Sequence, residues 1–165
     1  MLMVQVVVGY EWLMSGLAKT LRSGFVSGFA NDLRDRAPSA HWYKSFLDGT
    51  VIPNSHFFAY LIIIGEFAVG VTFIVAAGLW LWRWERLPTR GRIAVLAATA
   101  LAAVAAIFMN VNFHLANGSS HPWVLPKNGF DEGVDLDSLM PLLQFILLVV
   151  STDLLVKLRR ATRQH

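Results

Sequence analysis

The stretch HFFAYLIIIGEFAVGVTFIVAAGLWLW, from His56 to Trp82, decides the fold of this chain. A helix that crosses a bilayer needs about 20 consecutive apolar residues, and this stretch is longer than that. Its single acidic side chain is Glu66. At a rise of about 1.5 Å per residue, Glu66 lies roughly 15 Å from His56, near the middle of the hydrocarbon. A carboxyl group at that depth is costly, so Glu66 is the first candidate for a functional residue.

The composition of the whole chain is that of a membrane protein. Of its 165 residues, 55% are hydrophobic and 15% are charged, and this length predicts one domain. The chain has no cysteine, which excludes disulfides, thiolate metal sites, iron–sulfur ligation and a sulfur relay within the chain. Its net charge of +3 comes from basic residues that flank apolar segments. This distribution orients a membrane protein and does not indicate a nucleic-acid partner.

Apolar periodicity predicts an all-α integral membrane protein, built as a bundle of four transmembrane helices in the lipid bilayer. The predicted spans are about 1–21, 56–81, 93–112 and 138–156, joined outside the membrane by the long loops 22–55 and 113–137. An early Pro141 suits the first turn of the last span.

The first external loop is expected to carry helices of its own. Phe25, Phe29 and Leu33 form one helical stripe among polar residues, which predicts an amphipathic helix at the membrane interface. In a second short helix, roughly 40–47, aromatic side chains are expected to anchor the chain at the headgroup level: Trp42, Tyr43 and Phe46.

Basic residues predict the orientation of the four spans. One cluster follows the second span and another follows the fourth, so both lie on the same side of the membrane: Arg83, Arg86, Arg90 and Arg92, then Lys157, Arg159, Arg160 and Arg163. The positive-inside rule assigns that side to the cytoplasm. We therefore expect both termini in the cytoplasm.

Polar side chains of the four predicted helices trace a track from the outer surface to the membrane centre. Glu11 and Glu66 fall near mid-depth, and the others fall in the outer third or at the outer boundary: Lys19, His56, Asn110, Asn112 and His114. Glu11, Ser15 and Lys19 are spaced four residues apart and share one helix face. Trp12 also lies at mid-depth, away from the interfacial belt that tryptophan prefers. Such a track suits a ligand with carbonyl groups that takes up protons, and a membrane quinone has both properties.

Each of these residues also has a purely structural interpretation. Glu66 would then be a neutral, hydrogen-bonded residue that fixes helix register, and Lys19 would extend its amine toward the interface. The polar residues 110, 112 and 114 would join helices by hydrogen bonds or mark a helix end. His56 and His114 lie on one side, but nothing else in the sequence indicates haem, so none is expected. The acidic cluster 131–137 lacks the spacing of a calcium loop, and no metal site is expected.

Several short motifs occur in the order and topology of a known family. They are Gly9-Tyr10-Glu11-Trp12-Leu13, Ser15-Gly16-Leu17 and Lys19; Trp42-Tyr43, Phe46-Leu47 and Pro53; Gly65-Glu66 and Gly70; and Asn110-Val111-Asn112-Phe113 with Ala116-Asn117-Gly118. On these motifs the chain resembles the DoxX/DoxD family, four-helix membrane proteins that include the membrane subunit of thiosulfate:quinone oxidoreductase.

The resemblance implies a membrane oxidoreductase that passes electrons to quinone, together with a partner subunit. The resemblance also implies a prokaryotic plasma membrane as the location. From the polar track, Glu66 and Glu11 are predicted to bind or protonate the quinone head group. Lys19 is the third predicted catalytic residue and, with Asn110, Asn112 and His114, is expected to hold the anionic or polar partner near the outer face. The predicted binding residues are Trp12, Asn110, Asn112, His114 and His56. The alternative is a non-catalytic accessory subunit of a larger respiratory or other membrane complex, which the small size and the two structured external loops also fit.

Overall fold

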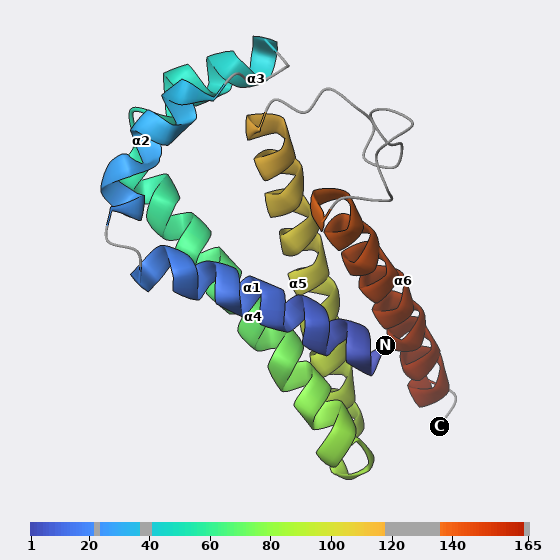
Figure 1. The fold of residues 1–165 in the computed structure, drawn as a ribbon. Coiled ribbons are helices and arrows are strands. Elements are labelled where there is room, and N and C mark those ends of the chain that lie inside the picture. Colours follow the sequence, from blue (N-terminus) through green and yellow to red (C-terminus); the bar gives the residue numbers. More distant parts are fainter. Residues whose placement is uncertain (22–23, 37–40, 118–135, 164–165) are drawn as a thin grey trace, which may run out of the picture.

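The computed structural model describes residues 1–21, 24–36, 41–117 and 136–163, and within them the chain is helical, without a strand. Figure 1 shows the six α-helices, whose bounds are α1 Leu2–Leu21, α2 Phe25–Asp35, α3 His41–Phe46, α4 Ser55–Trp82, α5 Thr89–Ala116 and α6 Leu136–Arg163. A π-helical segment, Leu47–Val51, follows α3, and a 3-10 turn, Trp84–Arg86, separates α4 from α5.

Three helices in the described ranges are long and apolar enough to cross a membrane: α4, α5 and the part of α6 from Leu139 to Thr162. By helix length and composition the chain is therefore an integral membrane protein. Helix α1, whose 20 residues include Glu11 and Lys19, is not among the three. Three of the four predicted spans are therefore confirmed as long apolar helices, and the fourth, at α1, stays a prediction.

Helices α4, α5 and α6 are longer than the predicted spans. Helix α5 begins at Thr89, directly after an extended Pro88, and continues to Ala116. Its polar run from Asn110 to His114, predicted to end the helix, is therefore helical and projects from the helix surface. Helix α6 begins at Leu136, so Pro141 lies in its interior and not in the first turn. The predicted second external loop lies mostly at 118–135, outside the described residues.

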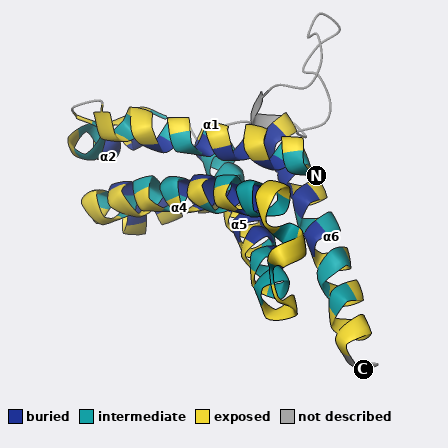
Figure 2. Ribbon diagram, turned by 90° about the horizontal axis from the view of Figure 1, so that it is seen from below, coloured by how far each residue is buried: buried dark blue, intermediate teal, exposed yellow. Residues whose placement is uncertain are grey.

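Helix α1 packs along α4, and α5 packs along α6 (Figure 1). Glycine permits the first contact, because a Cβ atom on Gly70 would lie 2.8 Å from the backbone nitrogen of Leu13 and 3.0 Å from the carbonyl oxygen of Gly9. The two backbones thus approach each other directly, as small residues allow in membrane helices. Figure 2 shows buried residues along all four long helices, with exposed residues turned outward.

The buried side chains form two hydrophobic clusters. The first joins α1, α4, α5 and α6: Val8, Trp12, Val69, Phe73, Ala102, Ala103, Ala106, Met140 and Leu147. The second joins α2, α3 and the π-helical segment to α4 and α5, and includes Phe29, Leu33, Tyr43, Leu47, Val51, Ile52, Ala59 and Ala116. We call α2, α3 and the segment Leu47–Val51 the cap.

Helix α2 confirms the predicted amphipathic helix, and its location at the membrane interface stays a prediction. Phe29 and Leu33 of α2 are buried, whereas Asn31 and Arg34 are exposed. The expected role of Tyr43 as an aromatic anchor at the headgroup level does not fit its position, since Tyr43 is only 4% exposed. Its hydroxyl donates to the backbone and side-chain oxygens of Asn112, at 3.1 and 3.2 Å. Burial of this phenol raises its pKa above the ordinary value.

Candidate functional site

The structure brings two of the predicted catalytic residues together. The Lys19 ammonium of α1 donates to Glu66 Oε1 of α4 over 2.7 Å and to Ser15 Oγ over 2.7 Å. The Ser15 hydroxyl donates to the same Glu66 oxygen over 3.1 Å. Glu66 is fully buried, and the Lys19 side chain is 24% exposed. We call these three residues the carboxylate–lysine site.

Local sequence explains why these side chains meet. Ser15 and Lys19 are one helical turn apart, so they present their polar atoms on the same face of α1. Gly16 lies between them and carries no side chain, which lets that face approach α4. A Cβ atom added to Gly16 would lie 3.2 Å from the Phe67 ring and 3.4 Å from the Glu66 Cβ. The absence of a side chain at Gly16 therefore sets the distance across which Lys19 reaches Glu66.

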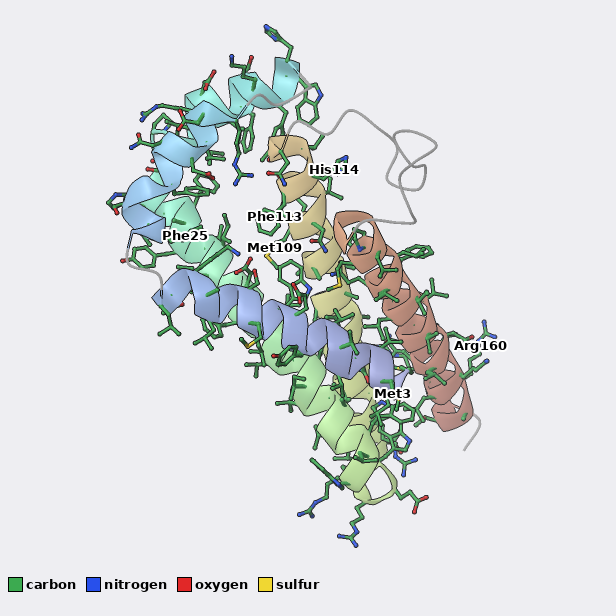
Figure 3. All side chains as sticks on the ribbon, viewed as in Figure 1. Met3, Phe25, Met109, Phe113, His114 and Arg160 are labelled. Carbon is green, nitrogen blue, oxygen red and sulfur yellow. The ribbon has the colours of Figure 1, made fainter. Side chains whose placement is uncertain are left out.

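Aromatic side chains from two further helices border the site. The Lys19 Nζ atom lies 5.8 Å from the ring centroids of both Phe25 in α2 and Phe113 in α5. The Phe113 ring is also 6.4 Å from the ring of Trp12, centroid to centroid. Phe25, Met109 and Phe113 are labelled in Figure 3, where Phe113 and Met109 extend from α5 toward α1 and α4. Four helices thus contribute to the surroundings of one ion pair.

Two polar atoms in these surroundings are buried without a hydrogen-bond partner in the structure. They are Glu66 Oε2, an acceptor when the carboxyl is ionised, and Trp12 Nε1, a donor. A buried polar group left unpaired costs about 1–3 kcal/mol. One acceptor and one donor in the surroundings of the carboxylate–lysine site are therefore left without a hydrogen bond in the structure.

The two predicted asparagines make contacts elsewhere. The Asn110 amide donates to Gln144 Oε1 of α6 over 2.9 Å, and Gln144 is fully buried. The Asn112 amide donates to the backbone oxygen of Phe108, and its side-chain oxygen accepts from Tyr43. Both asparagines therefore link helices by hydrogen bonds, which is the structural interpretation of these positions.

The remaining predicted residues do not extend the site. Glu11 is partly buried on α1, and no hydrogen bond or ion pair in the described ranges joins it to Lys19 or Glu66. His56 is exposed in the first turn of α4, about 15 Å along the helix from Glu66. His114 leaves α5 in a different direction from Phe113 (Figure 3). The predicted polar track is therefore not one continuous site. Its residues make separate groups of contacts, and only one of these groups contains Glu66.

Sequence reasoning did not assign three residues at this site. The four-residue spacing places Ser15 on the same face as Lys19, but the hydrogen bond from Ser15 to Glu66 requires the packing of α1 on α4. Phe113 belongs to a motif used for the family resemblance, and Phe25 to the amphipathic stripe of α2. Neither pattern indicates that the two rings lie equally far from Lys19.

In chemical terms, the described residues form a helical membrane protein with a buried carboxylate–lysine pair bordered by aromatic rings. No group of three or more histidine, aspartate or glutamate residues able to hold a metal ion occurs in the described part of the chain. Comparisons of the sequence with protein-family models and curated proteins, and of the structure with solved structures, found no significant match.

Proposed function

We propose that this chain is a quinone-interacting membrane subunit of an oxidoreductase. The observation that carries the proposal is the ion pair between Lys19 and the fully buried Glu66, which has an unpartnered carboxylate oxygen and lies beside the Phe113 and Phe25 rings. Quinone head groups are planar rings with oxygen atoms that accept hydrogen bonds. Lys19 can donate to such an oxygen, and Trp12 Nε1 is a second donor.

We also propose that α1 crosses the membrane, which gives four spans with both termini in the cytoplasm. Helix α1 has 20 residues and is therefore about 30 Å long, enough for the hydrocarbon layer. The Lys19 charge is offset by Glu66 and does not face lipid alone. In Figure 1, α1 runs alongside α4 in the opposite direction, as an up-and-down bundle requires.

The resemblance to the DoxX/DoxD family supports thiosulfate as the electron donor and a prokaryotic plasma membrane as the location. Two thiosulfate ions joined through a new sulfur–sulfur bond release two electrons, and quinone takes up these electrons with two protons. The chain has no cysteine to carry sulfur. We therefore propose that a partner subunit binds and oxidises thiosulfate, and that this chain holds the quinone.

Purified complex in lipid nanodiscs, supplied with decylubiquinone, tests this function. Wild type is expected to show thiosulfate-dependent quinone reduction, with a strong loss for Glu66→Gln. Glu85→Gln is the matched control, because Glu85 is an exposed residue of the 3-10 turn, remote in sequence from the site. Equal rates of quinone reduction for wild type and Glu66→Gln would show that Glu66 has no role in the reaction.

A second candidate function, an accessory subunit without catalysis, is favoured by the exposed aromatic side chains of the cap and the adjoining start of α4. Trp42 is 66% exposed, Phe57 65% and Tyr60 56%. Large aromatic side chains are enriched in protein interfaces. Purification in a mild detergent discriminates between the two functions. Co-migration with a large complex that is lost in Trp42→Ser, with quinone binding absent, would support the accessory role.

A further inference from the structure

We propose that the carboxylate–lysine site binds the reduced form of its ligand, hydroquinone, more tightly than the oxidised quinone. This inference rests on the proposed function and adds a preference for one redox state. It is carried by the unequal surroundings of the two Glu66 oxygens.

The Oε1 atom of Glu66 is already well supplied with hydrogen bonds. It accepts from the Lys19 ammonium at 2.7 Å and from the Ser15 hydroxyl at 3.1 Å. The Oε2 atom is buried and accepts none. The Lys19 ammonium, 2.7 Å from Oε1, favours the ionised carboxylate. An ionised carboxylate can only accept hydrogen bonds, so a ligand that satisfies Oε2 must bring a donor.

The two redox forms of a quinone differ in this respect. Both oxygens of the oxidised form are carbonyls, which accept from Lys19 or Trp12 but offer no hydrogen to Glu66. The hydroquinone has two hydroxyl groups, each of which donates and accepts. Only the reduced form can therefore give Oε2 a hydrogen bond, and bonds from hydroxyl to carboxylate are among the stronger ones in proteins.

The burial of Glu66 increases the effect of this difference in hydrogen bonding on the affinities of the two redox forms. Glu66 is 0% exposed, so bulk water does not compete for Oε2, and a ligand of either redox form reaches this oxygen only by displacing side chains that cover it. Placing a carbonyl oxygen beside this bare oxygen would set two acceptors against each other. We expect hydroquinone to bind at least about tenfold more tightly, which corresponds to about 1.4 kcal/mol.

The test compares decylubiquinol with decylubiquinone under anaerobic conditions, using full-length protein in nanodiscs and isothermal titration calorimetry. Wild type and Glu85→Gln are expected to prefer the quinol at least about tenfold. Glu66→Gln is expected to lose or reverse the preference, because its amide donates to a carbonyl. Infrared spectroscopy of the wild type adds a measurement that needs no variant. The carboxylate bands of isotope-labelled glutamate should shift with the quinol and stay unchanged with the quinone.

The outcomes separate this inference from the proposed function. If both forms bind wild type with equal affinity, or the quinone binds more tightly, the redox preference is wrong while quinone binding stands. If Glu66→Gln keeps the full quinol preference, the preference does not come from Glu66 and the inference is wrong. If neither form binds, the proposed function fails and the inference fails with it.

Discussion

Replacement of Lys19 by methionine should lower the free energy of unfolding far more than an exposed lysine would. The substitution keeps an unbranched side chain of similar size but leaves the fully buried Glu66 carboxylate without its ion-pair partner at 2.7 Å. Removing one member of a buried ion pair costs about 3–5 kcal/mol. The Lys19 side chain is 24% exposed and the Ser15 hydrogen bond remains, so a loss of about 3 kcal/mol is expected.

The matched control is Lys157→Met in α6. Lys157 lies 2.7 Å from Asp153, the same distance, but these side chains are 69% and 55% exposed. Exposed pairs contribute about 0–1 kcal/mol, so the two variants should differ by about 2 kcal/mol or more. Reversible unfolding in mixed micelles, followed by circular dichroism, measures both. A difference below about 1 kcal/mol would refute the argument that burial gives the Lys19–Glu66 pair its weight.

Two further predictions concern helix packing and the cap. Gly70→Ala should destabilise the chain by about 1–3 kcal/mol, because its Cβ would meet the α1 backbone. The control is Gly28→Ala, whose Cβ meets nothing within 4 Å, and which should be neutral or stabilising in the same unfolding measurement. Equal effects of the two substitutions would contradict the close approach of the α1 and α4 backbones. Burial raises the pKa of Tyr43, so its contribution to stability is complete below its ordinary pKa of 10.0 and is lost as pH rises through the raised value. Tyr43→Phe should lower the free energy of unfolding by about 1 kcal/mol at neutral pH, because the hydrogen bond to Asn112 is lost. The free energy of unfolding should then fall less steeply at alkaline pH than in the wild type. An equally steep fall in both proteins would mean that groups other than Tyr43 cause it.

The apolar stretches predicted the long helices well because their length and hydropathy depend on local sequence alone. Their ends were less predictable. Helix α5 begins four residues before the predicted span, because Pro88 is extended and Arg92 donates to the carbonyl oxygens of Trp84, Glu85 and Leu87, which stabilises the preceding turn. Such bonds between side chain and backbone depend on a turn geometry that hydropathy does not encode.

The candidate site was only partly predictable for a similar reason. Depth along each helix placed Glu66 and Lys19 as candidates but gave no information on how the helices are rotated against each other. Asn110 has a predicted depth similar to that of Lys19, yet its face of α5 is turned toward Gln144 of α6. Phe113, three residues further along α5, faces Lys19. Rotation about the helix axis, which follows from packing, decides which polar residue meets which.

In the proposed site, one oxygen of Glu66 serves helix assembly and the other serves ligand binding. A carboxyl on α4 is costly in lipid, and so is an ammonium on α1 if α1 crosses the membrane as proposed. Their pairing through Oε1 then offsets both costs when the helices associate. The Oε2 atom takes no part in that contact. Glu66→Gln keeps one oxygen, which can accept a hydrogen bond from Lys19, and replaces the other oxygen with an NH2 group, which donates. It should therefore reduce stability less than Lys19→Met does, while it changes ligand preference more. The reverse order would mean that Glu66 serves assembly alone.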